Sequence, residues 1–138
     1  QYLDLSFEKK KISKNKIIDM EIKKTGKLFS FCCMAPAIIK KKKSKEISFF
    51  ENIGANIGLL FQIADDLIDF KGTSKIAGKK TGKDKKKGKA TLISLLNYEN
   101  AIKYTNKIKY NIIQDLKKYG SKSNNIKETL NYILTRKK

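Results

Sequence analysis

Arginine and histidine are almost missing from this strongly basic sequence. The 138 residues contain 32 basic and 13 acidic side chains, a net charge of +19, no histidine and a single arginine, Arg136. Such a charge ordinarily indicates nucleic acid or an anionic membrane surface as the partner. Base readout and bidentate phosphate binding favour arginine over lysine, however. The composition therefore argues against nucleic acid as a partner, and a basic helical nucleic-acid-binding module is kept only as an alternative.

Cysteines and long apolar runs are also scarce. Cys32 and Cys33 are adjacent, so they lack the spacing of metal ligands and cannot form a disulfide framework. We expect them to be buried thiols in a reducing compartment, which fits a cytoplasmic protein. The apolar run from Leu28 to Ile39 is about twelve residues long, too short for a bilayer, and Pro36 interrupts it. No membrane span or signal peptide is expected, although a chain that begins with Gln1 can lack its true N-terminus.

The pattern of apolar residues predicts an all-α chain. No segment shows convincing strand-like alternation, and hydrophobic residues make up 40% of a length that suits one modest domain. Ser13 is a candidate N-cap for the first helix. The predicted helices are Lys14 to Ile39, Ser44 to Lys71, Thr91 to Leu96, Tyr98 to Tyr119 and Ile126 to Leu134, with a loop from Gly72 to Lys89 and a turn from Gly120 to Asn125.

The second predicted helix carries three carboxylates within an apolar stretch. Asp65 and Asp69 are four residues apart and Asp66 and Asp69 three apart, so Asp69 can share a face with either; Gln62, three residues before Asp65, joins that face. Carboxylates this close repel one another unless a cation lies between them. Oxygen ligands suit Mg²⁺, which often bridges carboxylates to a phosphate. The alternative is a solvated acidic turn on the helix surface.

Two further segments are rich in glycine and lysine or interrupt a helix. Residues 78–91 contain Gly-Lys-Lys-Thr-Gly-Lys-Asp and then Gly-Lys-Ala-Thr. Lysine provides a point charge for phosphate and glycine lets the backbone approach it; by composition alone the segment is a disordered linker. Thr25 and Gly26 are poor helix formers in the middle of a predicted helix, which indicates either a simple kink or a site that overrides local stability.

Taken together, the motifs resemble those of the trans-isoprenyl diphosphate synthases (polyprenyl synthetases), in particular the short-chain farnesyl and geranyl diphosphate synthases. Four motifs stand in the order and approximate spacing of that family. They are Gln1-Tyr2-Leu3-Asp4-Leu5, Lys24-Thr25-Gly26, Phe61-Gln62 with Asp65-Asp66-Leu67-Ile68-Asp69, and Gly78-Lys79 with Gly82-Lys83-Asp84 and Gly88-Lys89. The resemblance implies an isoprenoid-synthase-type helical bundle, of which this chain supplies the C-terminal half.

The resemblance also implies a reaction and the residues that carry it. The family joins an allylic diphosphate to isopentenyl diphosphate, 1′ to 4, with Mg²⁺, through a carbocation; the product is a short-chain prenyl diphosphate such as farnesyl diphosphate. Asp65 is implied as a direct Mg²⁺ ligand, with Asp66 and Asp69 as outer-shell or water-mediated partners. The other implied roles are diphosphate binding by Lys24, Lys79, Lys83 and Lys89, oxygen dipoles beside the cation from Thr25 and Gln62, and a polar wall containing Gln1 and Asp4.

The family pattern places a glycine before Gln1, so the sequence opens in the middle of a motif. We therefore expect residues 1–138 to be the C-terminal part of a single synthase domain. A first aspartate-rich motif, the isopentenyl diphosphate site and much of a homodimer interface are expected upstream, and the 138 residues alone are expected to be inactive. A non-catalytic partner subunit is a further alternative, and the complete carboxylate set argues against it.

Overall fold

The computed structural model describes residue 6, residues 12–77 and residues 91–136, and it is helical almost throughout these ranges. No strand occurs within them, which confirms the all-α prediction. The helices follow in the order α2 (Lys14–Glu21), η1 (Ile22–Gly26, a π-helix), α3 (Lys27–Ile39), α4 (Ser44–Ala77), α5 (Leu92–Leu96), α6 (Tyr98–Leu116), η2 (Lys117–Ser123, a 3₁₀-helix) and α7 (Asn124–Thr135).

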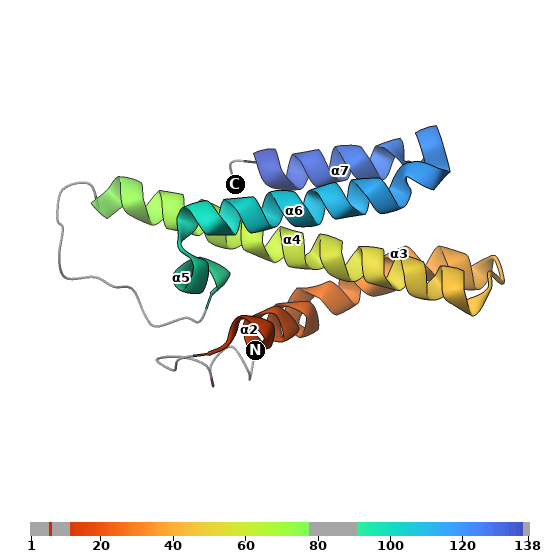
Figure 1. Ribbon diagram of the computed structural model, residues 1–138, viewed down its shortest axis with the longest axis horizontal. Helices are drawn as coiled ribbons and strands as arrows, with labels where there is room; N and C mark the ends of the chain where they lie inside the picture. Colours follow the sequence, from red (N-terminus) through yellow and green to blue (C-terminus); the bar gives the residue numbers. More distant parts are fainter. Residues whose placement is uncertain (1–5, 7–11, 78–90, 137–138) are drawn as a thin grey trace.

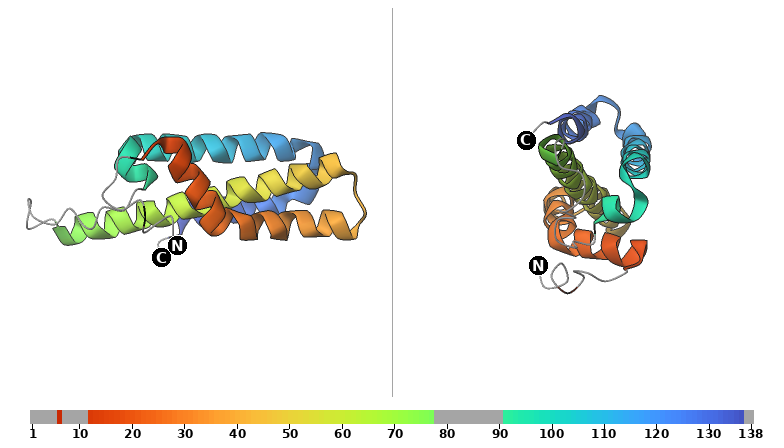
Figure 2. Two further views of the ribbon diagram at one scale, coloured as in Figure 1. Left: turned by 90° about the horizontal axis from the view of Figure 1, so that it is seen from below. Right: turned by 90° about the vertical axis from the view of Figure 1, so that its left-hand side faces the viewer.

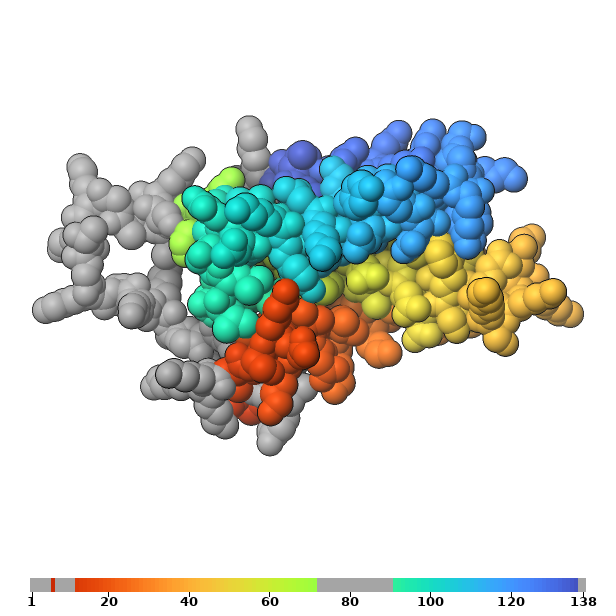
Figure 3. All heavy atoms as spheres, viewed as in Figure 1, coloured from red at the N-terminus to blue at the C-terminus, as the bar shows by residue number. Residues whose placement is uncertain are grey.

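The long helix α4 is the central element of the bundle. It runs the length of the molecule, with α3 folded back along its first part and α6 and α7 along its other flank (Figure 1). Viewed end-on, α4 lies between the α6–α7 pair and the α2–α3 segment (Figure 2). The space-filling view shows α5 and α6 over one flank of α4, while the hairpin of α3 and α4 projects at the opposite end of the molecule (Figure 3). Every other described helix is therefore arranged around α4.

Aliphatic side chains at helical spacing form the core. On α6, Ala101, Thr105, Ile108, Ile112 and Leu116 are buried, and they recur at the three- and four-residue intervals that define one helix face. From α7, Leu130 is completely buried in the same cluster. The α4 residues of the cluster are Ile53, Ile57, Leu59, Leu60, Ile63 and Ala64. This single cluster holds α4, α6 and α7 together.

The helix ends follow the local sequence closely. Thr91 and Ser94 form a capping box before α5, with both backbone-to-side-chain distances at 3.1 Å. The side chain of Asn97 accepts a hydrogen bond from the backbone N–H of Asn100 at 3.0 Å and starts α6. Gly120 has a φ of 54° between α6 and α7, a conformation that glycine adopts without a steric cost. These ends match the predicted boundaries to within a few residues.

Three predictions about local structure need correction. The helix predicted to end at Lys71 continues to Ala77, so the predicted loop loses its first six residues to α4; residues 78–90 lie outside the described part. Ser13 does occupy the N-cap position, but its side chain makes no capping hydrogen bond. Cys32 is exposed rather than buried, because it lies on the outer face of α3, whereas Cys33 is half-buried and burial raises the pKa of its thiol.

The segment Ser44–Lys71 of α4 has the length and the apolar composition of a membrane span, with a mean hydropathy of 1.2 over its most apolar window. Of that window, 44% is buried inside the protein. The core helix of a soluble bundle has the same length and composition, and α4 packs against α3, α6 and α7. Its apolar character is therefore explained by its central position in the bundle.

Candidate functional site

The site is organised by a close contact between the π-helical turn η1 and α4. A Cβ atom added at Gly58 would lie 2.6 Å from the Cα of Gly26, and one added at Gly54 would lie 2.6 Å from the Cα of Ser30. Only glycine permits main chains to approach this closely. The pair therefore serves close helix packing, and it places the turn that contains Lys24 and Thr25 directly against α4.

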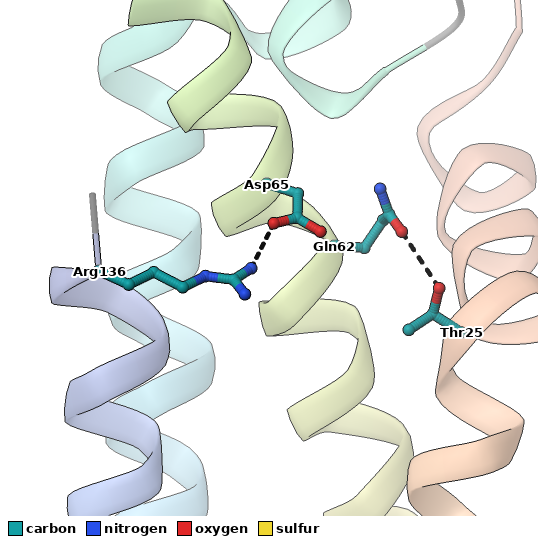
Figure 4. Close-up of polar contacts among 4 residues, drawn as sticks. All are labelled: Thr25, Gln62, Asp65 and Arg136. Carbon is teal, nitrogen blue, oxygen red and sulfur yellow. Dashed lines mark hydrogen bonds and ion pairs between the residues drawn. The ribbon is translucent and has the colours of Figure 1, made fainter. Parts of the chain in front are cut away.

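A hydrogen bond joins the two segments at this contact. The Thr25 hydroxyl donates to the Oε1 atom of Gln62 at 3.1 Å, in a partly buried position (Figure 4). The irregularity predicted at Thr25 and Gly26 is a five-residue π-helix between two α-helices, rather than a simple kink. Single π-turns within helices occur frequently at functional sites. The poor helix formers Thr25 and Gly26 thus lie in the π-helix, where Thr25 and Gln62, two of the predicted site residues, meet.

Asp66 lies beside this hydrogen bond in a largely buried position. Burial raises the pKa of Asp66 from its ordinary value of 3.8 to about 6, and the neighbouring carboxylates Asp69 and Asp65 add to the rise. The ammonium of Lys24 and a hydrogen bond from Gln62 oppose it. The rise has burial as its main cause, because removal from water disfavours the ionised carboxylate. A cation bound here would lower the pKa.

Asp65 lies between Gln62 and Arg136, with one carboxylate oxygen directed toward the C-terminal end of α7 (Figure 4). It forms an ion pair and hydrogen bond with Arg136, whose Nη2 donates to the Oδ1 atom of Asp65 (Figure 4). The guanidinium of Arg136 also lies 4.0 Å from the centre of the Phe61 ring, a cation–π contact. Only 12% of the Arg136 side chain is exposed, against 42% for Asp65. The arginine is therefore held firmly in place beside the carboxylate helix.

Arg136 is the functional candidate that the sequence did not predict. It is 71 residues away from Asp65 along the chain, so no local spacing connects the two. The one available signal is that it is the single arginine of the chain and follows directly on the last helix. Its pairing with Asp65 depends on how α7 packs against α4.

The structure brings some of the predicted site residues together and places others apart, and several lie outside the described residues. It brings Lys24, Thr25, Gln62 and Asp66 together across η1 and α4, and turns Asp65 toward Arg136. Asp69 is exposed on the same helix, close enough to Asp66 to raise its pKa. The predicted residues Gln1, Asp4, Lys79, Lys83 and Lys89 lie outside the described residues.

The carboxylates have the chemistry of an open magnesium site. Carboxylate oxygens are preferred Mg²⁺ ligands, and Mg²⁺ usually keeps several waters and takes one or two protein carboxylates together with phosphate oxygens. Within residues 12–77 and 91–136, no three histidine, cysteine, aspartate or glutamate side chains form a closed metal-binding group. Asp66 lies within the influence of both Asp65 and Asp69, so the three carboxylates are close to one another on α4. The residues fit an ion whose coordination is completed by water and phosphate.

The structure is thus an all-α bundle whose central helix carries an aspartate-rich motif against a Lys-Thr-Gly turn, the arrangement that the motif resemblance implies. The sequence model of one family, described as polyprenyl synthetase, matches residues 1–133. The chain therefore belongs to the polyprenyl synthetase family, which confirms the resemblance seen in its motifs.

Individual relatives agree with this assignment. The chain is 33% identical over 138 residues to a farnesyl diphosphate synthase of Micrococcus luteus, covering all of this chain and 47% of that protein. It is 38% identical over 104 residues to a geranylgeranyl diphosphate synthase of Cyanophora paradoxa, covering 75% of this chain and 35% of that protein. A crystal structure of an FPP/GFPP synthase from Zymomonas mobilis superimposes with a TM-score of 0.79 at 32% identity, covering 96% of this chain and 43% of the other. The chain spans less than half the length of these relatives.

Proposed function

We propose that this chain contributes the second aspartate-rich half of the active site of a Mg²⁺-dependent prenyltransferase. The reaction is the 1′-4 condensation of an allylic diphosphate with isopentenyl diphosphate, which gives a short-chain prenyl diphosphate such as farnesyl diphosphate. Membership of the polyprenyl synthetase family and the names of the relatives support this assignment. The observation that carries it is the Thr25–Gln62 hydrogen bond, because it brings the Lys-Thr-Gly turn and the aspartate motif together.

The physical demand of the reaction is to stabilise a departing diphosphate and to protect a carbocation from water. Mg²⁺, when bound, supplies Lewis-acid stabilisation of the negative charge on the leaving group. Asp65 would hold the metal directly, and Asp66 and Asp69 would hold it through water. In the conformation described here Asp65 is paired with Arg136, so we propose that metal binding shifts this pair.

The chain's own residues have distinct proposed roles. Lys24, which is close enough to Asp66 to influence its pKa, would hold the allylic diphosphate, together with Lys79, Lys83 and Lys89. Thr25 and Gln62 would direct their side-chain oxygens toward the developing positive charge; their mutual hydrogen bond fixes both side chains before substrate arrives. Gln1 and Asp4 would belong to the same polar wall.

The proposal includes a requirement for more polypeptide than these 138 residues. The sequence carries one aspartate-rich motif, whereas the reaction requires two sets of carboxylates. Large apolar side chains on α3 are exposed, with 67% of Leu28, 58% of Phe31 and 77% of Ile39 accessible to water. Apolar surface of this kind marks an interaction site. We propose that further polypeptide of the family fold covers it, and that the complete enzyme is a soluble, cytoplasmic homodimer.

A chimera tests the function. We replace the matching segment of the Micrococcus luteus synthase with this chain and supply labelled isopentenyl diphosphate, an allylic diphosphate and Mg²⁺. We expect label in a longer prenyl diphosphate, and we expect Asp65→Ala to lower turnover by ~10²-fold or more, since it removes a contact that matters most as the diphosphate departs. Asp115→Ala, an exposed carboxylate on α6, is the matched control and should leave turnover nearly unchanged.

In the same assay, residues 1–138 alone should not convert the substrates into an elongated prenyl diphosphate. Turnover by the isolated chain at the rate of a complete synthase would contradict the account based on two motifs. A folded chimera that binds Mg²⁺ but loses no activity on Asp65→Ala would contradict the assigned role of Asp65.

A further inference from the structure

A cavity of about 640 Å³ lies between α4, α6 and α7. Its α4 wall is formed by Ala64, Leu67, Ile68 and Lys71. Residues two apart on an α-helix point about 200° apart, so Ile68 lies nearly opposite Asp66 around α4. The cavity is therefore separate from the space beside Gln62 and Thr25, and α4 forms a wall of both.

The walls of this cavity suit a hydrocarbon chain. The aliphatic residues that line it are Leu67 and Ile68 from α4, Ile102 from α6, and Ile133 and Leu134 from α7. The α4 wall from Ala64 to Lys71 is ~10 Å long at the helical rise of 1.5 Å per residue. The volume falls within the usual range of small-ligand sites, roughly 300–1,000 Å³.

The charged residues of the cavity lining are both cationic, and the neutral polar residues Thr105, Asn106 and Thr135 line it as well. Lys71 and Arg136 line it, and no carboxylate does. The ammonium of Lys71 lies 5.9 Å from the centre of the Tyr98 ring, which also lines the cavity, so an aromatic contact keeps this cation at the rim. Arg136 is paired with Asp65, which lies outside the lining, so Lys71 and the remaining donors of Arg136 are the groups that favour an anionic ligand.

Arg136 has hydrogen-bonding capacity that the protein does not use. Its Nη2 donates to Asp65, but its Nε is buried and has no hydrogen-bond partner within the described residues. A buried donor left without an acceptor is costly, and native structures rarely retain one. Guanidinium groups take carboxylate and phosphate oxygens with particular strength because their N–H groups match the spacing of those oxygens. An anion that reached Arg136 would complete its hydrogen bonding.

We propose that the cavity between α4, α6 and α7 binds an amphipathic anion, a single hydrocarbon chain that ends in a carboxylate or a phosphate. The head group contacts Arg136, and the chain lies against Leu67, Ile68 and Ile102. The guanidinium of Arg136 therefore contacts both the ligand and Asp65 on α4. The site depends only on this cavity, and it stands whether or not the chain takes part in prenyl transfer.

Calorimetric titration of the 138-residue chain tests the site. The probes are decanoate and decyl phosphate below their micelle concentrations, with 1-decanol as the uncharged chain and acetate and inorganic phosphate as head groups alone. We expect one anion per chain, with the alcohol and the bare head groups binding at least tenfold more weakly. Tighter binding of decyl phosphate than of decanoate would assign the site to phosphate esters, and the reverse to fatty acids. Equal binding of 1-decanol, or many equivalent sites on this highly charged chain, would overturn the proposal.

Variants locate the site. Ile102→Trp fills the cavity and should weaken decanoate and decyl phosphate binding at least tenfold, while Tyr110→Trp on the exposed face of the same helix should not. Since filling a cavity can impair folding, Arg136→Gln provides an independent test: it should weaken both anions at least tenfold without changing the affinity for 1-decanol. Circular dichroism checks that each variant is folded. Unchanged anion affinity in folded Ile102→Trp or in Arg136→Gln would show that the ligand binds elsewhere.

Discussion

The two flanks of α4 pack against their neighbours in different ways, one through glycine and the other through large aliphatic side chains. Against η1 and α3 the helix presents Gly54 and Gly58, so that main chain meets main chain. Against α6 and α7 it presents large aliphatic side chains that meet others such as Ile112 and Leu130, and a cavity remains between the helices. The first flank fixes distances because nothing lies between the backbones, whereas the second fixes stability because much apolar surface is buried. The polar site lies on the first flank.

The largest effect on stability is expected on the aliphatic flank. Ile112 is 1% exposed within the core cluster, and Ile112→Ala removes buried methyl groups and leaves a cavity. We expect the free energy of unfolding, measured in urea, to fall by about 3 kcal/mol. The side-chain amide resonance of Gln62 should keep its chemical shift, because the contact between η1 and α4 does not include Ile112. Tyr110→Ala, at an exposed position on the same helix, is the control.

Compared with Ile112→Ala, substitution of Gly58 should cost less stability and should change the site more. Helix propensity alone predicts that Gly58→Ala stabilises α4 by about 1 kcal/mol. The added Cβ would lie 2.6 Å from the Cα of Gly26, so the helices must separate, and we expect a net destabilisation of about 2 kcal/mol. The Gln62 amide resonance should shift as the Thr25–Gln62 hydrogen bond lengthens. A stabilised variant with an unchanged Gln62 resonance would show that the two flanks do not differ in this way.

The smallest effect concerns the pH dependence contributed by Asp66. Its pKa is about 6 in the folded chain against an ordinary 3.8, so between these values the folded state binds more protons than the unfolded state. Stability must therefore fall as pH rises from about 4 to about 6. A pKa displaced by one is worth about 1.4 kcal/mol, and partial exposure to water reduces the effect, so we expect Asp66→Asn to stabilise the chain by on the order of 1 kcal/mol at pH 7.

The measurement for Asp66 is thermal unfolding in buffer with a metal chelator. Wild type and Asp66→Asn should have similar melting temperatures near pH 4 and diverge above pH 6, with the variant more stable. Parallel curves across this range would mean that Asp66 does not titrate as its burial indicates. Asp115→Asn, exposed on α6, is the matched control.

The same contrast explains which features were predictable. Helix periodicity predicts α6 and α7 because their buried residues repeat every three or four positions. The end of α4 was placed at Lys71 because glycine and lysine usually indicate a loop, whereas the structure continues the helix to Ala77. Cys32 was expected to be buried because cysteine usually is, but the face on which it lies depends on tertiary packing.

The site was predictable where its residues are local to a motif. Asp65, Asp66, Asp69 and Gln62 follow from spacing on one helix, and the family resemblance supplied Lys24 and Thr25. Which partners these residues select was not predictable. Asp65 turns to Arg136, 71 residues away, because α7 ends beside it, and Gln62 turns to Thr25 because two glycines allow the close approach.

The close approach of the main chains at Gly26 and Gly58 also determines which sequence changes leave the site geometry intact. Of the 32 basic residues, 31 are lysine and one is arginine. Changes at exposed positions, and exchanges among aliphatic residues in the core, need not move Thr25 relative to Gln62, because the contact between the two helices is made mainly by the main chain. Gly54 and Gly58, where an added Cβ would collide with the main chain of the neighbouring helix, thus keep the site geometry independent of changes elsewhere in the sequence.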